Sequence, residues 1–341
     1  MNARRLRASL RGWGGVGAMA LACATALILA LMLPDSARGD GGSGTGGAGL
    51  ALGTQAKAAD CTDPQNRSLA PSGADGATID AIKSRKDRRL IVGVDQNSYH
   101  WGYRDPNNPK AGGDLEGFDI DLVHAIAKDI LGDENAVQFR AIPTSQRIPA
   151  IQSGKVDMVV RTMTITCERL KDVSFSAPYF KTGQQVLAPV NSGITGYDKS
   201  LAGKRICSAD GSTANDRLIA DRGSGSLASS AVVLPAVPNQ LDCLVRLQLG
   251  EADAVVTDGA LAASQAAQDP TVELKGGTFT TEYYGVAMKR GSDDLVRRVN
   301  QVLADYRKDG WRQSYDKWLA PTLGPDSPSE NPPVAEYRQP A

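Results

Sequence analysis

Hydrophobic residues change between strand-like and helix-like spacing through the middle of the chain. A short β-branched run at Arg89–Val94 predicts a strand, and Phe118–Leu131 carries apolar residues at helical spacing before Gly132. The next predicted elements are a strand at Val137–Ile142, a short helix at Arg147–Gly154 and a strand at Val156–Val160. Such alternation predicts α/β layers around a largely parallel sheet.

A second series of the same kind follows Gly183. Its predicted strands lie near Lys204–Cys207, Ala231–Leu234 and Ala252–Thr257, and its predicted helices at Ala214–Asp221 and Asn239–Leu249. Two series of strands and helices predict two α/β lobes rather than one larger layer.

One segment of the first series is repeated in the second. Gln152–Val160 matches Gln248–Val256 at the glutamine, the glycine, the aspartate and both valines. Each copy predicts a helix end, a tight turn and a buried strand. Because ligands of open α/β sheets lie beyond the carboxyl ends of the strands, we expect the residues after each copy to face a cleft. These are Arg161–Thr164 in one lobe and Thr257–Asp258 in the other.

Both ends of the chain differ from its middle. The first 11 residues hold four arginines and no acid, and Gly12–Pro34 carries no charge. This pattern predicts a signal peptide or signal anchor over residues 1–38. Residues 39–60 follow as a glycine-rich tether, and residues 321–341 form a proline-rich tail. Cys23 lies inside the apolar run, and whether the chain is released, anchored or lipidated stays open.

Charge and composition exclude several functional classes. The 38 basic and 38 acidic residues balance, and without residues 1–59 there are 32 basic and 36 acidic ones. This composition argues against a nucleic-acid-binding protein, which would carry a clustered basic excess. The sequence has no HExxH or GxSxG motif and no set of residues that would make an enzyme. No cofactor and no metal site are expected.

Four cysteines lie outside the apolar segment: Cys61, Cys167, Cys207 and Cys243. An even number in an exported chain favours two disulfides, and four cysteines allow three pairings. Zinc is the competing interpretation, but there is no CxxC pair and there are only two histidines.

The residues after the two repeated strands suggest an α-amino-acid site. Arg169, with Thr162 and Thr164, can offer a guanidinium fork and hydroxyls to a carboxylate. Asp258 from the other lobe can bind an ammonium group.

Arg147 and Arg161 are further cations, more than one carboxylate needs. A ligand with a second, side-chain carboxylate would use them. The alternative is that the arginines pair with acids of the chain such as Glu168 or Asp157.

Three segments carry a resemblance to a known family: Leu115–Leu122, Asp157–Arg169 and Val173–Phe180. They resemble the family 3 extracellular solute-binding proteins of ABC amino-acid importers, over roughly residues 88–319. The Thr-x-Thr-x4-Arg pattern ending at Arg169 and the Phe-Ser-x-Pro-Tyr that comes after it are its most specific parts. Within the family the chain resembles the binders of glutamate, aspartate and glutamine.

The resemblance implies a two-lobed periplasmic-binding-protein-like fold of type II, in which a hinge crossed twice joins two α/β lobes. Residues 61–183 with 285–320 would form lobe 1, and residues 184–284 lobe 2. We prefer the disulfides Cys61–Cys167 and Cys207–Cys243 among the three pairings.

The same resemblance implies a role for each site residue. Arg169 and Thr164 would bind the α-carboxylate, and Thr162 and Asp258 the α-amino group. Arg147 would bind a distal carboxylate, and Ser212 and Thr213 lie in the loop that closes on the ligand. The chain departs from the family at two positions. Ser98 stands where many relatives stack an aromatic ring, so that Tyr99 or Trp101 would substitute, and Arg161 replaces a usually small residue.

The function expected from this resemblance is capture of an amino acid outside the cytoplasm, by a monomer that is secreted or membrane-anchored. The ligand would be glutamate, aspartate or one of their amides, delivered to an ABC permease. The alternative is a sensor of the same fold that reports ligand occupancy to a membrane signalling partner. No enzymatic activity is expected.

Overall fold

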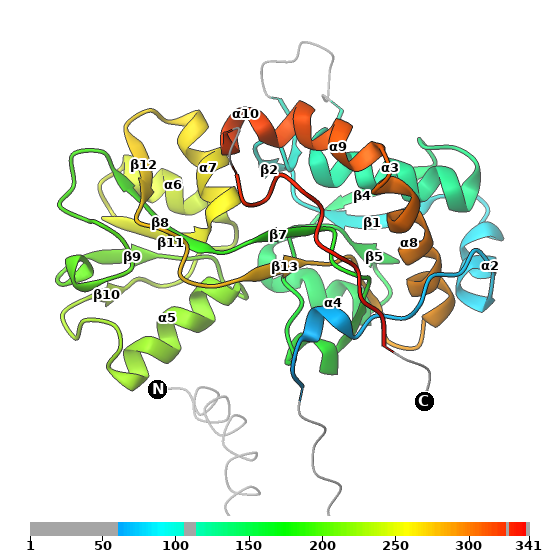
Figure 1. Ribbon diagram of the computed structural model, residues 1–341, viewed down its shortest axis with the longest axis horizontal. Coiled ribbons are helices and arrows are strands. Elements are labelled where there is room, and N and C mark those ends of the chain that lie inside the picture. Colours follow the sequence, from blue (N-terminus) through cyan, green and yellow to red (C-terminus); the bar gives the residue numbers. More distant parts are fainter. Residues whose placement is uncertain (1–60, 106–113, 325–326, 339–341) are drawn as a thin grey trace, which may run out of the picture. The chain divides into compact units, whose positions relative to one another are not determined.

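The computed structural model describes residues 61–105, 114–324 and 327–338 (Figure 1). The predicted export segment and tether, residues 1–60, lie outside the described residues, and so does Cys23. Among the helices that the structure describes, none has the length and apolar character needed to cross a membrane.

Two five-stranded sheets organise the described chain. The first has the order β4-β1-β5-β14-β6. Its strands are β1 (Leu90–Val94), β4 (Val137–Ala141), β5 (Met158–Val159), β6 (Val173–Phe175) and β14 (Ala287–Lys289). Its helices are α2 (Ala77–Lys83), α3 (Phe118–Leu131), α4 (Arg147–Gln152), α8 (Asp293–Tyr306), α9 (Gly310–Ser314) and α10 (Ala320–Leu323). We call this part the first lobe.

The second sheet has the order β10-β9-β11-β8-β12. Its strands are β8 (Gln184–Pro189), β9 (Arg205–Cys207), β10 (Val232–Val233), β11 (Ala254–Asp258) and β12 (Val272–Lys275). Apolar side chains of α5 (Thr213–Ser224) cover one face, and those of α6 (Gln240–Gln248) and α7 (Gly259–Gln268) the other. This second lobe lies on the left in Figure 1.

The prediction of largely parallel sheets holds for only part of each sheet. In the first, β1 pairs in parallel with β4 and β5, whereas β14 is antiparallel to β5 and β6. In the second, β9 is parallel to β10 and β11, whereas β8 is antiparallel to β11 and β12. The reason is the route of the chain. β8 enters from the other lobe and β14 returns from it, so neither follows a crossover helix that would make it parallel.

Two short strands carry the chain between the lobes. β7 (Phe180–Thr182) leads into the second lobe, β13 (Glu282–Tyr284) leads back, and the two pair antiparallel (Figure 1). Gly183 is needed at the first crossing, because a Cβ there would collide with the carbonyl of Thr280. The two-lobed fold with a double crossing is therefore confirmed.

The repeat found in the sequence is also a repeat in structure. Gly154 and Gly250 adopt left-handed φ angles of 69° and 68° after a helix end. Asp157 accepts the backbone N–H of Ile91 at 2.8 Å, and Asp253 accepts that of Arg205 at 2.7 Å. In each lobe the aspartate therefore joins the start of one strand to the neighbouring strand, which explains why these residues recur.

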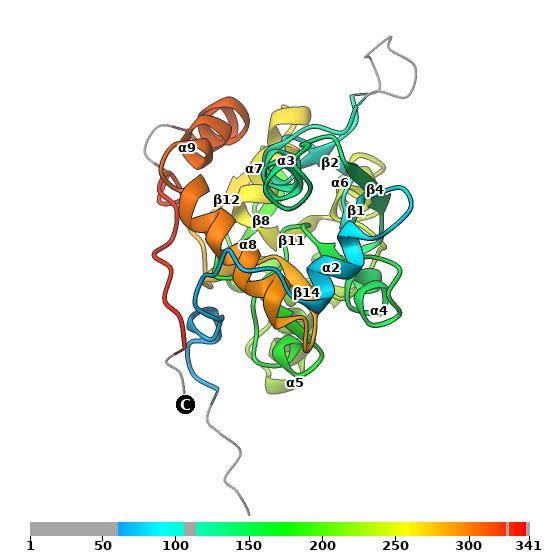
Figure 2. The ribbon, with the colours of Figure 1, turned by 90° about the vertical axis from the view of Figure 1, so that its right-hand side faces the viewer.

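The two ends of the described chain meet on the first lobe. Residues 327–338 contain no helix or strand and run beside the N-terminal segment (Figure 2). The N–H of Arg338 donates to the carbonyl of Ser68 at 2.9 Å, and Asn66 donates to Glu336 at 2.7 Å.

Both disulfides have the preferred pairing, Cys61–Cys167 and Cys207–Cys243. The first ties the N-terminal segment to the loop that carries Arg169, two residues away. The second ties β9 to α6 inside the second lobe.

Candidate ligand-binding site

Two arginines of the first lobe converge on one atom of the second. Arg147 begins α4, and Arg169 begins the turn after the loop that follows β5. An Nη2 atom of each donates to the carbonyl oxygen of Gly211, at 3.0 Å in both cases. Gly211 has a φ of 71°, and a Cβ there would meet Ser145, so the backbone approaches this closely only as glycine.

Neither guanidinium forms an ion pair with a carboxylate of the described residues. Arg147 is 3% exposed and Arg169 8%. Their other hydrogen bonds also go to backbone carbonyls, those of Thr144, Arg161 and Thr162 for Arg147 and that of Thr164 for Arg169. Burial lowers the pKa of both side chains, and for Arg147 the neighbouring Arg169 and Arg161 lower it further. A buried cation with only neutral partners is costly, and an anion would relieve that cost.

Two threonines extend the arginine pair. Thr162 has a φ of 41°, a left-handed conformation that is strained for a residue with a branched side chain. Its N–H donates to Asp119 at 3.1 Å, which holds it there. Thr162 and Thr164 are both buried, and their hydroxyls have no hydrogen-bond partner within the described ranges.

Asp258 supplies the opposite charge from the end of β11. Tyr284 lies on β13, the strand that leads back to the first lobe, and its hydroxyl donates to Asp258 Oδ2 at 2.6 Å. Desolvation and the nearby Glu282 raise the pKa of Asp258 to about 7, although the Tyr284 bond and the two arginines oppose the shift. Asp258 is thus a buried acid in the field of Arg147 and Arg169.

The loop before α5 contains Gly211 and therefore lies against the two arginines. Ser212 is the N-cap of α5, and its hydroxyl accepts the N–H of Asn215 at 3.1 Å. Thr213 is the first helical residue, so its N–H has no partner inside the helix. Its hydroxyl donates to Glu282 at 3.2 Å, which connects this loop to β13.

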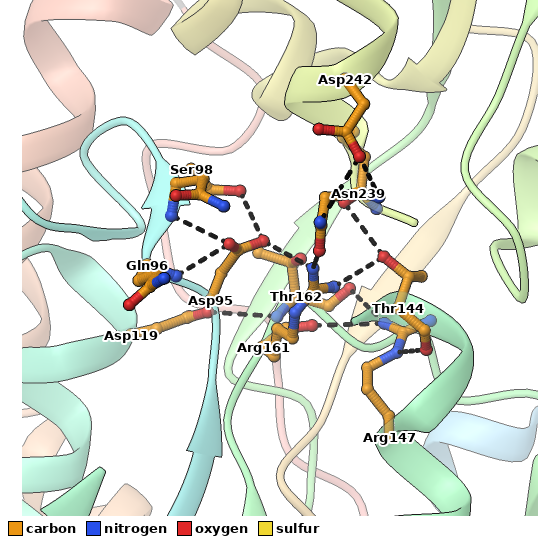
Figure 3. Close-up of polar contacts among 12 residues, drawn as sticks. Asp95, Gln96, Ser98, Asp119, Thr144, Arg147, Arg161, Thr162, Asn239 and Asp242 are labelled. Atoms are coloured by element: carbon orange, nitrogen blue, oxygen red, sulfur yellow. Dashed lines mark hydrogen bonds and ion pairs between the residues drawn. The ribbon is translucent and has the colours of Figure 1, made fainter. Parts of the chain in front are cut away.

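Arg161 differs from the other two arginines, because its charge is already paired. It is 0% exposed and forms an ion pair with Asp95 at 2.7 Å (Figure 3). It also donates to Thr144 at 2.9 Å and to Asn239 at 3.0 Å. The sequence-based alternative foresaw pairing within the chain but named Glu168 and Asp157, whereas the partner is Asp95.

The two aromatic candidates, Tyr99 and Trp101, both pack against other rings. The ring of Tyr99 stacks on His100 at 3.7 Å and meets the edge of Tyr103. Trp101 is fully buried among Phe118, Phe180 and Tyr284, and it donates to Ser264 at 3.2 Å. Trp101 therefore joins the two lobes through the core, and its ring contacts are all with these core residues.

Sequence reasoning missed three acids near the site: Asp95, Asp119 and Glu282. Asp95 directly follows β1, so the strand-end signal that found Arg161 would also have found it. Asp119 is buried and accepts from Thr162 and Tyr179, and desolvation raises its pKa to about 7. Its place depends on how α3 packs, and no local pattern in the sequence indicates that.

Comparison with known proteins gives one family. Residues 90–321 match the model of the bacterial extracellular solute-binding proteins, family 3. The ABC transporter glutamine-binding protein GlnH of Bacillus subtilis is 35% identical, over 74% of this chain and 92% of its own length. The glutamate-binding protein GluB of Corynebacterium efficiens is 29% identical, over 70% of this chain and 80% of its own.

Among solved structures, the solute receptor for L-cysteine of Neisseria gonorrhoeae matches with a TM-score of 0.64 and 30% identity. The match covers 73% of this chain and 96% of the receptor. These three proteins carry the names of three different amino acids, so the ligand of this chain has to be argued from its own site.

Proposed function

Because the chain belongs to the bacterial extracellular solute-binding proteins, family 3, we propose that it captures an acidic amino acid, glutamate or aspartate, and delivers it to an ABC permease. Proteins of this family bind solutes and are not enzymes, and the chain is accordingly a binding protein. We propose that the protein binds its ligand outside the cytoplasm.

The observation that carries this proposal is the charge pattern of the candidate site. Arg147 and Arg169 are buried, converge on one oxygen and lack an acidic partner among the described residues, while Asp258 faces them. An acidic amino acid carries two carboxylates and one ammonium group, so it matches two guanidinium groups and one carboxylate group for group.

Other amino acids leave part of this pattern unmatched. A cationic side chain would face two buried guanidinium groups, which disfavours it by direct repulsion. An amide side chain could accept hydrogen bonds from Arg147, but it carries no negative charge to balance the guanidinium group. The site therefore favours an acid over its amide, and an amide over a cation.

Within this proposal each residue has one role. Arg169 and Thr164 bind the α-carboxylate, and Arg147 binds the distal one. Asp258 and Thr162 bind the ammonium group. A ligand carboxylate replaces the Gly211 carbonyl between the two arginines, since a full negative charge is the stronger acceptor. Ser212 and Thr213, at the start of α5, then close on the ligand.

Closure would occur about the paired strands β7 and β13. We propose residues 61–183 with 285–320 as one moving body and residues 184–284 as the other, because Gly183 and Tyr284 flank the two crossings. Ligand contacts from both bodies favour the closed form, so binding shifts the open–closed population.

Calorimetry on the full-length chain with glutamate, aspartate, glutamine, asparagine and arginine tests the proposal. We expect the acids to bind at least about tenfold more tightly than their amides, as for a buried charge that gains its partner, and arginine not to bind. The Arg147→Gln variant should still bind glutamine but should no longer prefer the acids to their amides. Arg140→Gln, an exposed arginine on β4, is the matched control. Equal binding of glutamate and glutamine by the wild type would overturn the assignment of an acidic ligand.

A further inference from the structure

Arg161 is the centre of a polar network that joins the two lobes beside the proposed ligand site (Figure 3). Its Nη2 atom lies 2.7 Å from Asp95 Oδ2 and donates to Asn239 Oδ1 at 3.0 Å. Asp95 ends β1 in the first lobe, whereas Asn239 precedes α6 in the second. One guanidinium group therefore holds an acid on its own side and an amide on the opposite side.

Thr144 adds two more bonds between the lobes at the same place. Its N–H donates to the carbonyl of Pro238 at 3.1 Å, and its hydroxyl donates to Gln240 at 3.3 Å. The same hydroxyl accepts from Arg161 at 2.9 Å. We call Asp95, Thr144 and Arg161, together with residues 238–240, the latch.

Both halves of the latch are held in position by their own lobes. Asp95 also accepts from the N–H groups of Gln96 and Asn97 and from the hydroxyl of Ser98, at 2.8–3.0 Å. Asn239 is the N-cap of α6, and its N–H donates to Asp242 at 3.0 Å. Little side-chain freedom is then lost when the halves meet, which favours the contact.

The latch does not depend on an amino acid for its charges. Arg161 is 0% exposed and the Asp95 side chain 7%, so the ion pair is buried and neutral as a unit. This is the contrast with Arg147 and Arg169, whose charges have only carbonyl partners in the described parts of the chain.

We propose that Arg161 is a closure residue and not a ligand contact: the latch stabilises the closed arrangement of the lobes whether or not an amino acid is bound. A closed population that exists before binding raises the apparent affinity for every ligand by the same factor. The latch therefore sets how tightly the protein binds, while Arg147, Arg169 and Asp258 set which amino acid it binds. The role of the latch rests on the proposed closure of the two lobes on a ligand.

Two variants test the latch without leaving Asp95 unpaired. Arg161→Lys keeps the ion pair but loses the planar fork that reaches Thr144 and Asn239 together. Asn239→Ser keeps an N-cap oxygen for α6 but is too short to reach Arg161.

The first measurement is hydrogen–deuterium exchange of the full-length chain, followed in the peptide that contains Thr144, because the Thr144 amide bonds across the lobes. Without amino acid, we expect faster exchange of that peptide in both Arg161→Lys and Asn239→Ser. Unchanged exchange in both variants would refute the latch.

The second measurement is calorimetry of the same variants with glutamate and glutamine. Arg161→Lys and Asn239→Ser should weaken both ligands by the same factor, roughly tenfold for one bond to a charged group. Selective loss of glutamate binding would instead make Arg161 a ligand contact and overturn the proposal.

Arg205→Lys is the matched control, because Arg205 pairs with Asp253 inside the second lobe and does not cross between the lobes. It should change neither the exchange of the Thr144 peptide nor the affinity. Failure of the proposed ligand is a separate outcome: if glutamate and glutamine bind equally, the uniform effect of the latch is still measurable on both.

Discussion

The two copies of the repeated turn show how one scaffold can carry opposite charges. In both copies a helix ends, a left-handed glycine turns the chain and an aspartate holds the next strand, at Gly154 and Asp157 in the first lobe and at Gly250 and Asp253 in the second. The two copies differ beyond the strand. The first lobe continues into a loop that ends at Arg169, whereas the second ends its strand at Asp258.

This difference separates the residues that make the fold from those that we propose to bind the ligand. The shared residues satisfy backbone groups, and each lobe needs them for the same reason. The residues beyond the strands also make contacts outside their own lobe's sheet: Arg169 reaches across to Gly211, and Asp258 accepts from Tyr284 on β13. Substitutions on the two sides of this boundary should therefore affect different properties.

Arg169→Gln should have the largest effect, on binding alone. Removing one partner of a buried charge pair costs roughly 2–5 kcal/mol, so we expect loss of measurable binding of every amino acid. Stability without amino acid should be retained or improved, because a buried cation with carbonyl partners is removed. Calorimetry and thermal unfolding of the full-length chain measure the two effects. Normal binding by this variant would remove Arg169 from the site.

Asp258 should give the site its pH dependence. Its pKa of about 7 means that the carboxyl must lose a proton before it can pair with an ammonium group. Affinity for glutamate should rise roughly fivefold between pH 6 and pH 7 and about twofold more by pH 8, in line with linkage. Asp258→Asn should bind more weakly, and its affinity should no longer change over this range. A wild-type affinity that is constant from pH 6 to pH 8 would contradict this role.

The raised pKa of Asp258 has the opposite effect on stability, because it should lower the free energy of unfolding as the pH rises. The folded-state pKa of Asp258 lies above its ordinary value of 3.8, so the protonated carboxyl favours the folded protein. This contribution to the free energy of unfolding is full below about pH 4 and is lost as the pH rises through 7. Unfolding curves without amino acid at pH 5 and pH 8, for the wild type and Asp258→Asn, measure it.

Asp157→Asn and Asp253→Asn should have smaller effects, on stability and not on binding. Asp157 pairs with Arg85 as a fork and is 10% exposed, whereas the Asp253 side chain is 30% exposed. We expect Asp157→Asn to cost about 1–3 kcal/mol, as for a lost bond to a charged group. Asp253→Asn should cost less, because solvent screens the more exposed pair. Urea unfolding measures both, and a larger cost at Asp253 would contradict the ranking.

Much of the fold can be predicted from local patterns in the sequence. The helix Phe118–Leu131 agrees with its prediction to the residue, and the three strands and two helices predicted in the second lobe agree to within a few residues. The strands β8 and β12 and the helix α7 were not predicted. These elements are set by apolar periodicity and by glycines at their ends, both of which act over a few residues. The mixed direction of the strands was missed, because it depends on where β8 and β14 enter their sheets.

The candidate site divides in the same way. The sequence by itself determined that cations would come after one repeated strand and an acid after the other, because strand ends of α/β sheets meet at one edge. It could not determine which cations remain available to an anion. That depends on contacts between residues far apart in the chain, and only the tertiary structure decided it.

Arg161 shows the physical reason most clearly. In the sequence it is equivalent to Arg147 as a cation near the strand end. In the folded protein Asp95 Oδ2 lies 2.7 Å from Arg161 Nη2. Within the part of the chain that the structure describes, the guanidinium groups of Arg147 and Arg169 meet only carbonyl oxygens. The charge of a side chain is a property of its residue type, but the counter-charge beside a buried group is set by packing. Packing therefore separates Arg147 and Arg169, which can bind an anion, from Arg161, which joins the lobes.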